Sequence, residues 1–262
     1  MGLDWMFYQR RFGGSSVKVG RVQIPFGIYN EVRDVGTLLP FYRPSDVFYG
    51  EGHFATETVD GIVLSHAFGG GSSWQLDGDL HYGSWSLIRQ NTTGGGFSRS
   101  KANDSLGVEL WLTTPVPGLR IGTGGMRFEI EQPDGGKGHA ENYHGSLAWE
   151  LGRVATHIEA RHVDLPTAAL DEGYIHLGVQ VADKVTVNGQ YDTTNAKNDI
   201  VRKTVKIDKD TALGVNYAFR PDLVLKLENH WNEGYLQEDP PLAMFMPQSK
   251  TRYWIASLST SF

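Results

Sequence analysis

The residues of this sequence that come closest to a catalytic group are His144 and Ser146. A serine becomes a nucleophile when a nearby histidine takes its proton, so such a pair would suit ester hydrolysis. Alternation along an extended strand places both side chains on one face with Glu150, and it places Tyr143 and Leu147 on the other. The pair therefore faces a polar interior, whereas a lipid-cleaving pair should lie on the apolar face. We predict no catalytic residue.

The candidate metal ligands also lack the right geometry. On a strand, His157 and Glu159 share a face, but His162 lies on the other face and cannot complete a zinc site. Asp77 and Asp79 flank a glycine, yet two carboxylates without further oxygen ligands make a poor calcium site. We predict no metal ion and no cofactor.

Apolar and polar residues alternate with a period of two along most of the chain, which is typical of strands with one apolar face. The clearest runs are residues 74–82, 106–112, 175–181, 213–219 and 223–231. No window approaches the roughly 18 consecutive apolar residues of a membrane helix, and the mean hydropathy is −0.33. We expect about 13 strands of roughly 9–12 residues, the length with which a tilted strand crosses a bilayer.

The Gly122–Gly125 run is glycine-rich, but no helix follows it, so it is not a phosphate-binding loop. The apolar phase changes between Ile121 and Phe128. An extra residue in a strand would produce such a change, and we therefore predict a β-bulge in this run.

The predicted connections between strands alternate between short and long. Tight turns are expected at places such as Gly13–Gly14 and Gly152–Arg153, and longer polar loops at residues 28–57, 90–103, 132–141, 166–172, 193–209 and 233–250. Tight turns at one end and loops at the other are typical of bacterial outer-membrane barrels, as is an aromatic last residue, here Phe262. We predict one all-β domain over residues 1–262, a transmembrane antiparallel up-and-down β-barrel in the bacterial outer membrane.

The expected strand count is odd, whereas bacterial single-chain barrels have an even number of strands with both termini in the periplasm. We therefore expect this chain to be part of a barrel of about 14–16 strands, with the missing strands before Met1. Residues 1–5 also show no basic segment followed by an apolar run, so no signal peptide is expected there.

Charged residues of both signs lie at the polar positions of the predicted strands, where they would line a water-filled lumen and screen solutes by charge. Polar lumen residues are also expected in any water-filled barrel. A single charged residue is therefore weak evidence for a charge filter, and the whole set of charged residues is stronger evidence. The candidate pore-lining residues on strands are Arg21, Asp77, Asp79, Arg120, Arg127, Glu129, Glu159, Arg161, Lys226 and Glu228.

The longest predicted loop, residues 28–57, contains many apolar side chains that a solvated loop would not need. Folding into the barrel would bury them against the wall and narrow the pore, with Arg33, Asp34 and Arg43 at the constriction. The alternatives are a contact between subunits and an outer lid.

The residues from Gly20 to Gly27, which read GRVQIPFG, lead into this loop and then into Asp60-Gly61-Ile62. This order resembles Gram-negative porins of the phosphate-selective porin group. The resemblance is specific over roughly residues 5–64 and implies an outer-membrane channel, typically of about 16 strands, that forms a homotrimer and begins with further N-terminal sequence. The dense arginine and lysine ladder of phosphate channels is not seen, so phosphate selectivity is not carried over.

The composition sets the remaining expectations. The chain has 262 residues, a net charge of −6 and no cysteine, so nucleic-acid binding, disulfides and thiolate metal sites are not expected. We predict a porin that passes small hydrophilic solutes or ions passively and contacts outer-membrane lipid and lipopolysaccharide. The alternatives are a non-channel outer-membrane barrel, either structural or lipid-modifying, and a soluble β-rich binding protein.

Overall fold

The computed structural model describes residues 4–50, 56–69, 73–90, 97–131, 136–166, 168–198, 203–234 and 249–261. Thirteen strands form one sheet in which each strand pairs antiparallel with the next along the chain. The strands are β1 Met6–Phe12, β2 Ser15–Gln23, β3 Thr58–Phe68, β4 Gln75–Gln90, β5 Phe97–Thr113, β6 Leu119–Glu131, β7 Lys137–Leu151, β8 Val154–Leu165, β9 Ala168–Ala182, β10 Val185–Asn198, β11 Lys203–Arg220, β12 Leu223–Gly234 and β13 Ser249–Thr260.

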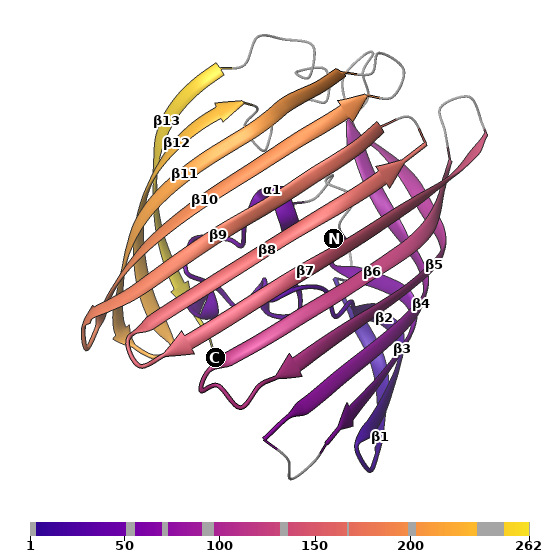
Figure 1. Ribbon diagram of the computed structural model, residues 1–262, viewed down its shortest axis with the longest axis horizontal. Helices are drawn as coiled ribbons and strands as arrows, with labels where there is room; N and C mark the ends of the chain where they lie inside the picture. Colours follow the sequence, from indigo (N-terminus) through magenta and orange to yellow (C-terminus); the bar gives the residue numbers. More distant parts are fainter. Residues whose placement is uncertain are drawn as a thin grey trace.

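The sheet curls into the wall of a barrel with strongly tilted strands (Figure 1). β1 and β13 are its two edges, and no pairing joins them in the part of the chain that the structure describes. This up-and-down arrangement confirms the predicted fold class.

Large apolar side chains cover the outer face of the barrel. Leu106, Leu213 and Leu227 are about half exposed, and the neighbouring outward positions are also apolar or aromatic. A surface of this kind suits a barrel surrounded by lipid, because its backbone polar groups are satisfied within the sheet. None of the described helices is long and apolar enough to cross a membrane.

Several strands extend further than the sequence pattern predicts. The predicted loop at residues 193–209 is mostly strand, because β10 continues to Asn198 and β11 begins at Lys203. The predicted loop at residues 166–172 is similarly shortened by the start of β9 at Ala168. The hydrophobic alternation stops where the sequence becomes polar, but backbone hydrogen bonding between paired strands does not depend on it.

The predicted bulge at Gly122–Gly125 is wrong. β6 pairs with β7 in continuous register from Leu119 to Glu131, and the irregularity lies instead in β5, between Asn103 and Leu106. The change of apolar phase has another cause: Met126, Phe128 and Ile130 point inward and are buried by other parts of the protein.

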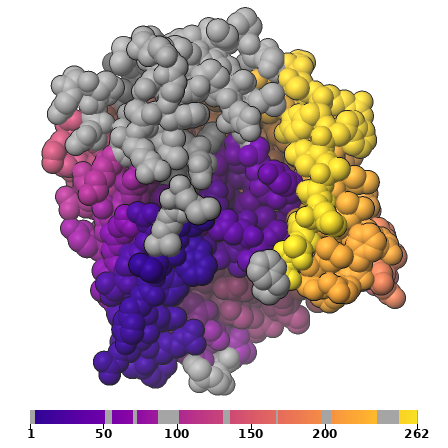
Figure 2. Space-filling view, turned by 180° about the vertical axis from the view of Figure 1, so that it is seen from behind, coloured from indigo at the N-terminus to yellow at the C-terminus, as the bar shows by residue number. Residues whose placement is uncertain are grey.

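The chain between β2 and β3 turns into the barrel. Its described residues 24–50, here called the inward segment, contain the short helices η1 Asn30–Val32, η2 Gly36–Leu38 and α1 Asp46–Tyr49. α1 contacts β8, β9 and β10 from inside. In Figure 2 purple atoms lie between the indigo N-terminal strands and the yellow β13. The inward segment therefore occupies part of the barrel interior and packs against the wall.

Candidate pore constriction

One part of the inward segment packs against the wall through aromatic side chains. Phe48 is fully buried, and its ring lies 5.2 Å from that of Phe26 and 4.9 Å from that of Tyr49. These rings join the apolar cluster that includes Trp85 and Phe128 on the wall. This contact, which we call the apolar contact, explains why a loop carries so many apolar residues.

A hydrogen-bonded pair lies within the apolar contact. The Tyr49 hydroxyl donates to the Glu159 carboxylate on β8 and accepts the backbone N–H groups of Ile28, at 2.7 Å, and Tyr29, at 3.0 Å. Burial and the nearby Glu159 raise the pKa of Tyr49 well above its ordinary value, so the hydroxyl stays a neutral donor. Gly27 has a φ of 61°, and a Cβ there would lie 2.6 Å from Glu159, so this last glycine of the GRVQIPFG motif is required by both conformation and space.

Arg161 fixes the same region from the wall. Its guanidinium pairs with Glu172, donates to the Val47 carbonyl at 3.2 Å and lies 5.1 Å from the centre of the Phe48 ring. Both partners of the ion pair are fully buried. A buried arginine must be paired and hydrogen-bonded, and here its bonds also tie the start of α1 to β8.

The other part of the inward segment is attached to β10–β12 by polar side chains, and we call this the polar contact. The Lys226 amine donates to the carbonyls of Gly36, at 2.6 Å, Leu39, at 2.7 Å, and Phe41, at 2.6 Å. Glu228 accepts the Tyr42 N–H at 2.5 Å. Backbone groups of the segment thus form hydrogen bonds with charged side chains of the wall rather than with a neighbouring strand.

Two further bonds belong to the polar contact. Asn216 donates to the carbonyl of Pro40 at 2.9 Å, and the Ser45 hydroxyl donates to Asp192. Because these donors and acceptors come from three adjacent strands, the segment is held along a line across the inner wall.

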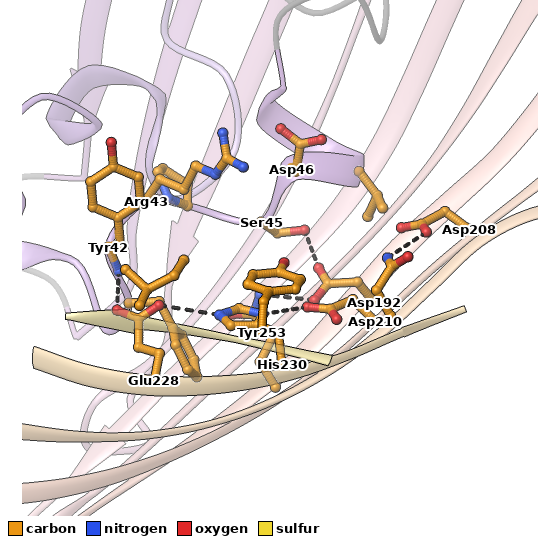
Figure 3. Close-up of a pocket in the computed structure, with 16 residues that line it drawn as sticks. Tyr42, Arg43, Ser45, Asp46, Asp192, Asp208, Asp210, Glu228, His230 and Tyr253 are labelled. Atoms are coloured by element: carbon orange, nitrogen blue, oxygen red, sulfur yellow. Dashed lines mark hydrogen bonds and ion pairs between the residues drawn. The ribbon is translucent and has the colours of Figure 1, made fainter. Parts of the chain in front are cut away.

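An open pocket lies between the polar contact and the inner face of β10–β13 (Figure 3). Its acidic side chains outnumber its basic ones, which are Arg43 and His230. His230 is held by Asp210 at 2.6 Å and Glu228 at 3.3 Å, and its ring stacks on Tyr253 at 4.7 Å. The acidic residues that line the pocket are Asp46, Asp192, Asp208, Asp210 and Glu228.

Most of the predicted strand residues lie on the inner face, but they do not form one constriction. Glu159 and Arg161 belong to the apolar contact, whereas Lys226 and Glu228 belong to the polar contact. Arg120 lies over the Trp111 ring at 4.8 Å, away from both contacts. Asp77 and Asp79 also occupy inward positions, on β4, outside the pocket.

The prediction that Arg21, Arg127 and Glu129 line the lumen is wrong. Val22 and Phe128 are buried inside the barrel, so the adjacent residues point outward. Their charges are balanced across strands instead. Arg21 pairs with Asp60 at 2.7 Å, Arg127 with Glu141 at 3.5 Å, and Glu129 with Lys137 at 2.7 Å.

The three charged residues predicted on the loop also separate. Arg43 lines the acidic pocket. Arg33 instead donates to Asn30 at 3.4 Å, and Asp34 lies near Glu57 at the other end of the loop. Of the three, Arg43 alone lies in the pocket.

Sequence reasoning missed Asp192, Asp208, Asp210 and His230. The predicted loop at residues 193–209 includes Asp208, although positions 208, 210, 212 and 214 continue the inward alternation of β11. Extending the strand pattern through these polar residues would have placed both aspartates on the inner face.

His144 and Ser146 bond to different carboxylates. His144 pairs with Glu109 at 2.9 Å, and Ser146 donates to Glu159 at 2.5 Å. The described residues contain no cluster of side chains suited to hold a metal ion.

Comparison with solved structures identifies the fold. OmpT, expressed in the outer membrane of Vibrio cholerae, superposes with a TM-score of 0.59 and 12% identity over 97% of this chain and 79% of that one. The outer-membrane channel DcaP of Acinetobacter baumannii gives 0.62 and 8% identity over 98% and 83%. An anion-selective porin from Comamonas acidovorans gives 0.55 and 8% identity over 95% and 71%.

No protein-family model matches the chain, and a search of curated proteins finds no match. The structural likeness, at such low identity, shows the fold alone. That fold is the β-barrel of outer-membrane proteins.

Proposed function

We propose that this protein is a porin of the bacterial outer membrane that passes small hydrophilic solutes by passive diffusion. The inward segment forms the constriction, and the acidic pocket beside it forms part of the path. The fold and its apolar outer surface support the membrane location. The channel function is inferred from the inner face.

The observation that carries the proposal is the grouping of carboxylates around an open space. Asp192, Asp208 and Asp210 face the same pocket, and its cations are too few to pair with all of its acids. Carboxylates gathered in this way stay charged only where water reaches them, because burying unpaired charge in a dry interior is costly. A water-filled space lined by negative charge favours cations over anions.

The finer family assignment belongs to the same proposal. The GRVQIPFG motif resembles the phosphate-selective porin group, but an acidic pocket does not suit phosphate. A homotrimer is supported by the resemblance and by the fold shared with the trimer form of Vibrio cholerae OmpT, which aligns with a TM-score of 0.57 at 13% identity. Each subunit of the trimer would then contain its own path for solutes.

A second candidate function is a structural barrel filled by its inward segment. The apolar contact favours this candidate, because it seals the interior against β2–β9 with buried rings. The two candidates differ in whether water passes beside the polar contact. A lipid-modifying enzyme has no comparable support, since His144 and Ser146 bond to different carboxylates.

Single-channel recording in planar bilayers tests the proposal. We expect ohmic conductance with cation preference from protein that shows heat-modifiable migration on gels. Asp208→Asn combined with Asp210→Asn should reduce the preference for cations. The matched control is Glu141→Gln with Asp164→Asn, two carboxylates that lie opposite each other on the outer face of β7 and β8.

Folded protein without conductance would contradict the channel and support the filled barrel. An equal loss of cation preference in the control would show that the selectivity does not arise in the pocket.

A further inference from the structure

The outer face of β10–β13 carries a row of aromatic side chains at the upper limit of its apolar surface. Tyr191, Trp231 and Trp254 are exposed by 37%, 38% and 71%. Tyr191 lies opposite Thr211, which in turn lies opposite Trp231, so the row crosses adjacent strands. Val187, Leu213 and Leu227 continue the apolar surface on one side of this row. Aromatic side chains at such a boundary mark the level of lipid head groups.

Basic side chains lie beside the aromatic rings of this row. The Arg252 guanidinium lies 5.2 Å from the Trp231 ring and 5.8 Å from the Trp254 ring. Its Nε donates to Asn229 at 3.0 Å. Lys209 lies 5.6 Å from the Tyr191 ring. Because the rings and the asparagine hold the guanidinium, its position on the surface is set before any ligand arrives.

The charge of this patch is mainly positive. Lys250, whose side chain is 79% exposed, pairs with Glu233 at 3.5 Å. We call Lys209, Lys250 and Arg252 the basic rim. On the outer face of β7–β9 acidic residues lie beside basic ones instead.

Those acidic positions lie on neighbouring strands. Glu141 lies opposite Asp164, and Asp171 lies beside His162. Arg127 and His162 pair with these carboxylates, so an anionic group would be attracted more strongly to the basic rim than to this mixed sector.

The basic rim lies at the end of the barrel that carries the long connections. β12 and β13 are joined there by residues 235–248, and β2 and β3 by residues 24–57, whereas the opposite end has connections such as Gly152–Arg153. In outer-membrane barrels the long connections are extracellular. The rim thus faces the outer leaflet, whose lipopolysaccharide carries phosphates on a sugar head group.

We propose that the basic rim binds the phosphorylated sugar head group of lipopolysaccharide, with its acyl chains against the apolar face below Trp231 and Trp254. Arginine and lysine donate charge-assisted hydrogen bonds to phosphate, and a fixed guanidinium can make two at once. This inference rests on the membrane location in the proposed function, but not on conduction through the lumen.

Native mass spectrometry of the protein released from nanodiscs tests the inference. The nanodiscs contain phosphatidylcholine with either diphosphorylated lipid A or the same lipid A after removal of its phosphates. Wild-type protein should retain the diphosphorylated form and lose the dephosphorylated form. Equal retention of the two forms would overturn the inference without any substitution.

A triple variant of the basic rim provides an independent test. Lys209→Ser, Lys250→Ser and Arg252→Ser together should weaken retention by about tenfold or more, because the charge-assisted bonds to phosphate are lost. The control is Arg127→Ser with Lys137→Ser, two outward cations of the β6–β7 sector, which should retain lipid A as wild type does. Heat-modifiable migration confirms that each variant is folded.

The remaining outcomes separate other occupants of the rim. Loss of trimer with retained lipid A in the triple variant would identify the rim as a subunit contact and overturn the inference. Full displacement of lipid A by millimolar inorganic phosphate would show a simple anion site and also overturn it. Conductance recorded in pure phosphatidylcholine tests the channel separately, because the rim lies outside the lumen.

Discussion

The apolar and polar contacts hold the same segment against two sides of one barrel by different physical means. On the β2–β9 side, Phe26 and Phe48 remove a large apolar area from water. On the β10–β12 side, Lys226 and Glu228 bind backbone groups of the segment, and beside them the acidic pocket stays open. The first contact excludes water and positions the segment, and the second leaves room for water and solutes.

The difference has an energetic basis. Dispersion and burial of rings stabilise most when no space is left between them. A buried lysine must first lose its hydration, and its hydrogen bonds offset that cost. We therefore expect substitutions in the apolar contact to affect stability most, and substitutions near the polar contact to affect conduction most.

The largest expected effect is that of Phe48→Ala. Removal of a fully buried ring should lower the free energy of unfolding by about 3–5 kcal/mol. Urea unfolding in detergent, followed by tryptophan fluorescence, measures the change. Tyr42→Ala, which removes a side chain that is 52% exposed on the same segment, should change stability by less than about 0.5 kcal/mol. Similar losses in both variants would show that the apolar contact does not position the segment.

Lys226→Met should have the next largest effect. Three carbonyls of the segment lose their donor, and the expected loss of stability is about 2–4 kcal/mol. Conductance should rise because the segment is released on the side of the pocket. Asn216→Ala, which removes a single bond to Pro40, should cost about 1 kcal/mol. Unchanged conductance in a destabilised Lys226→Met protein would place the solute path elsewhere.

A smaller effect is expected for the arginines of the segment. Arg43→Gln removes a cation from the acidic pocket and should raise the preference for cations over anions. Arg33→Gln should leave selectivity unchanged, because that side chain bonds to Asn30 outside the pocket. Reversal potentials in a salt gradient measure the ion selectivity of both variants. An equal shift in the two variants would mean that the whole segment, rather than its polar contact, sets selectivity.

The smallest effect concerns pH. Burial, followed by the nearby Asp34, raises the pKa of Glu57 above its usual 4.5. A carboxyl with a raised pKa in the folded protein favours folding when protonated, and this contribution is lost as pH rises through the folded pKa. The hydrogen-exchange protection factors of residues 24–50 should therefore fall from acidic to neutral pH. The change should be weaker in Glu57→Gln, and the same pH dependence in both proteins would exclude Glu57 as its source.

The sequence by itself determined the strands and their up-and-down order. For the loop between β2 and β3 it offered an inward course beside two alternatives, a subunit contact and an outer lid. Alternation with a period of two is a local property, so it was readable wherever one face is apolar, as at residues 213–219. The apolar side chains of the loop likewise required a wall to bury them.

The tertiary structure decided which polar residues meet. Phe128 turns inward because the interior is apolar on that side, and this reverses the expected faces of Arg127 and Glu129. Asp192, Asp210 and His230 come from three strands and converge through the register between those strands. Neither result can be read from one strand, because the period of a pattern does not state what covers each of its faces.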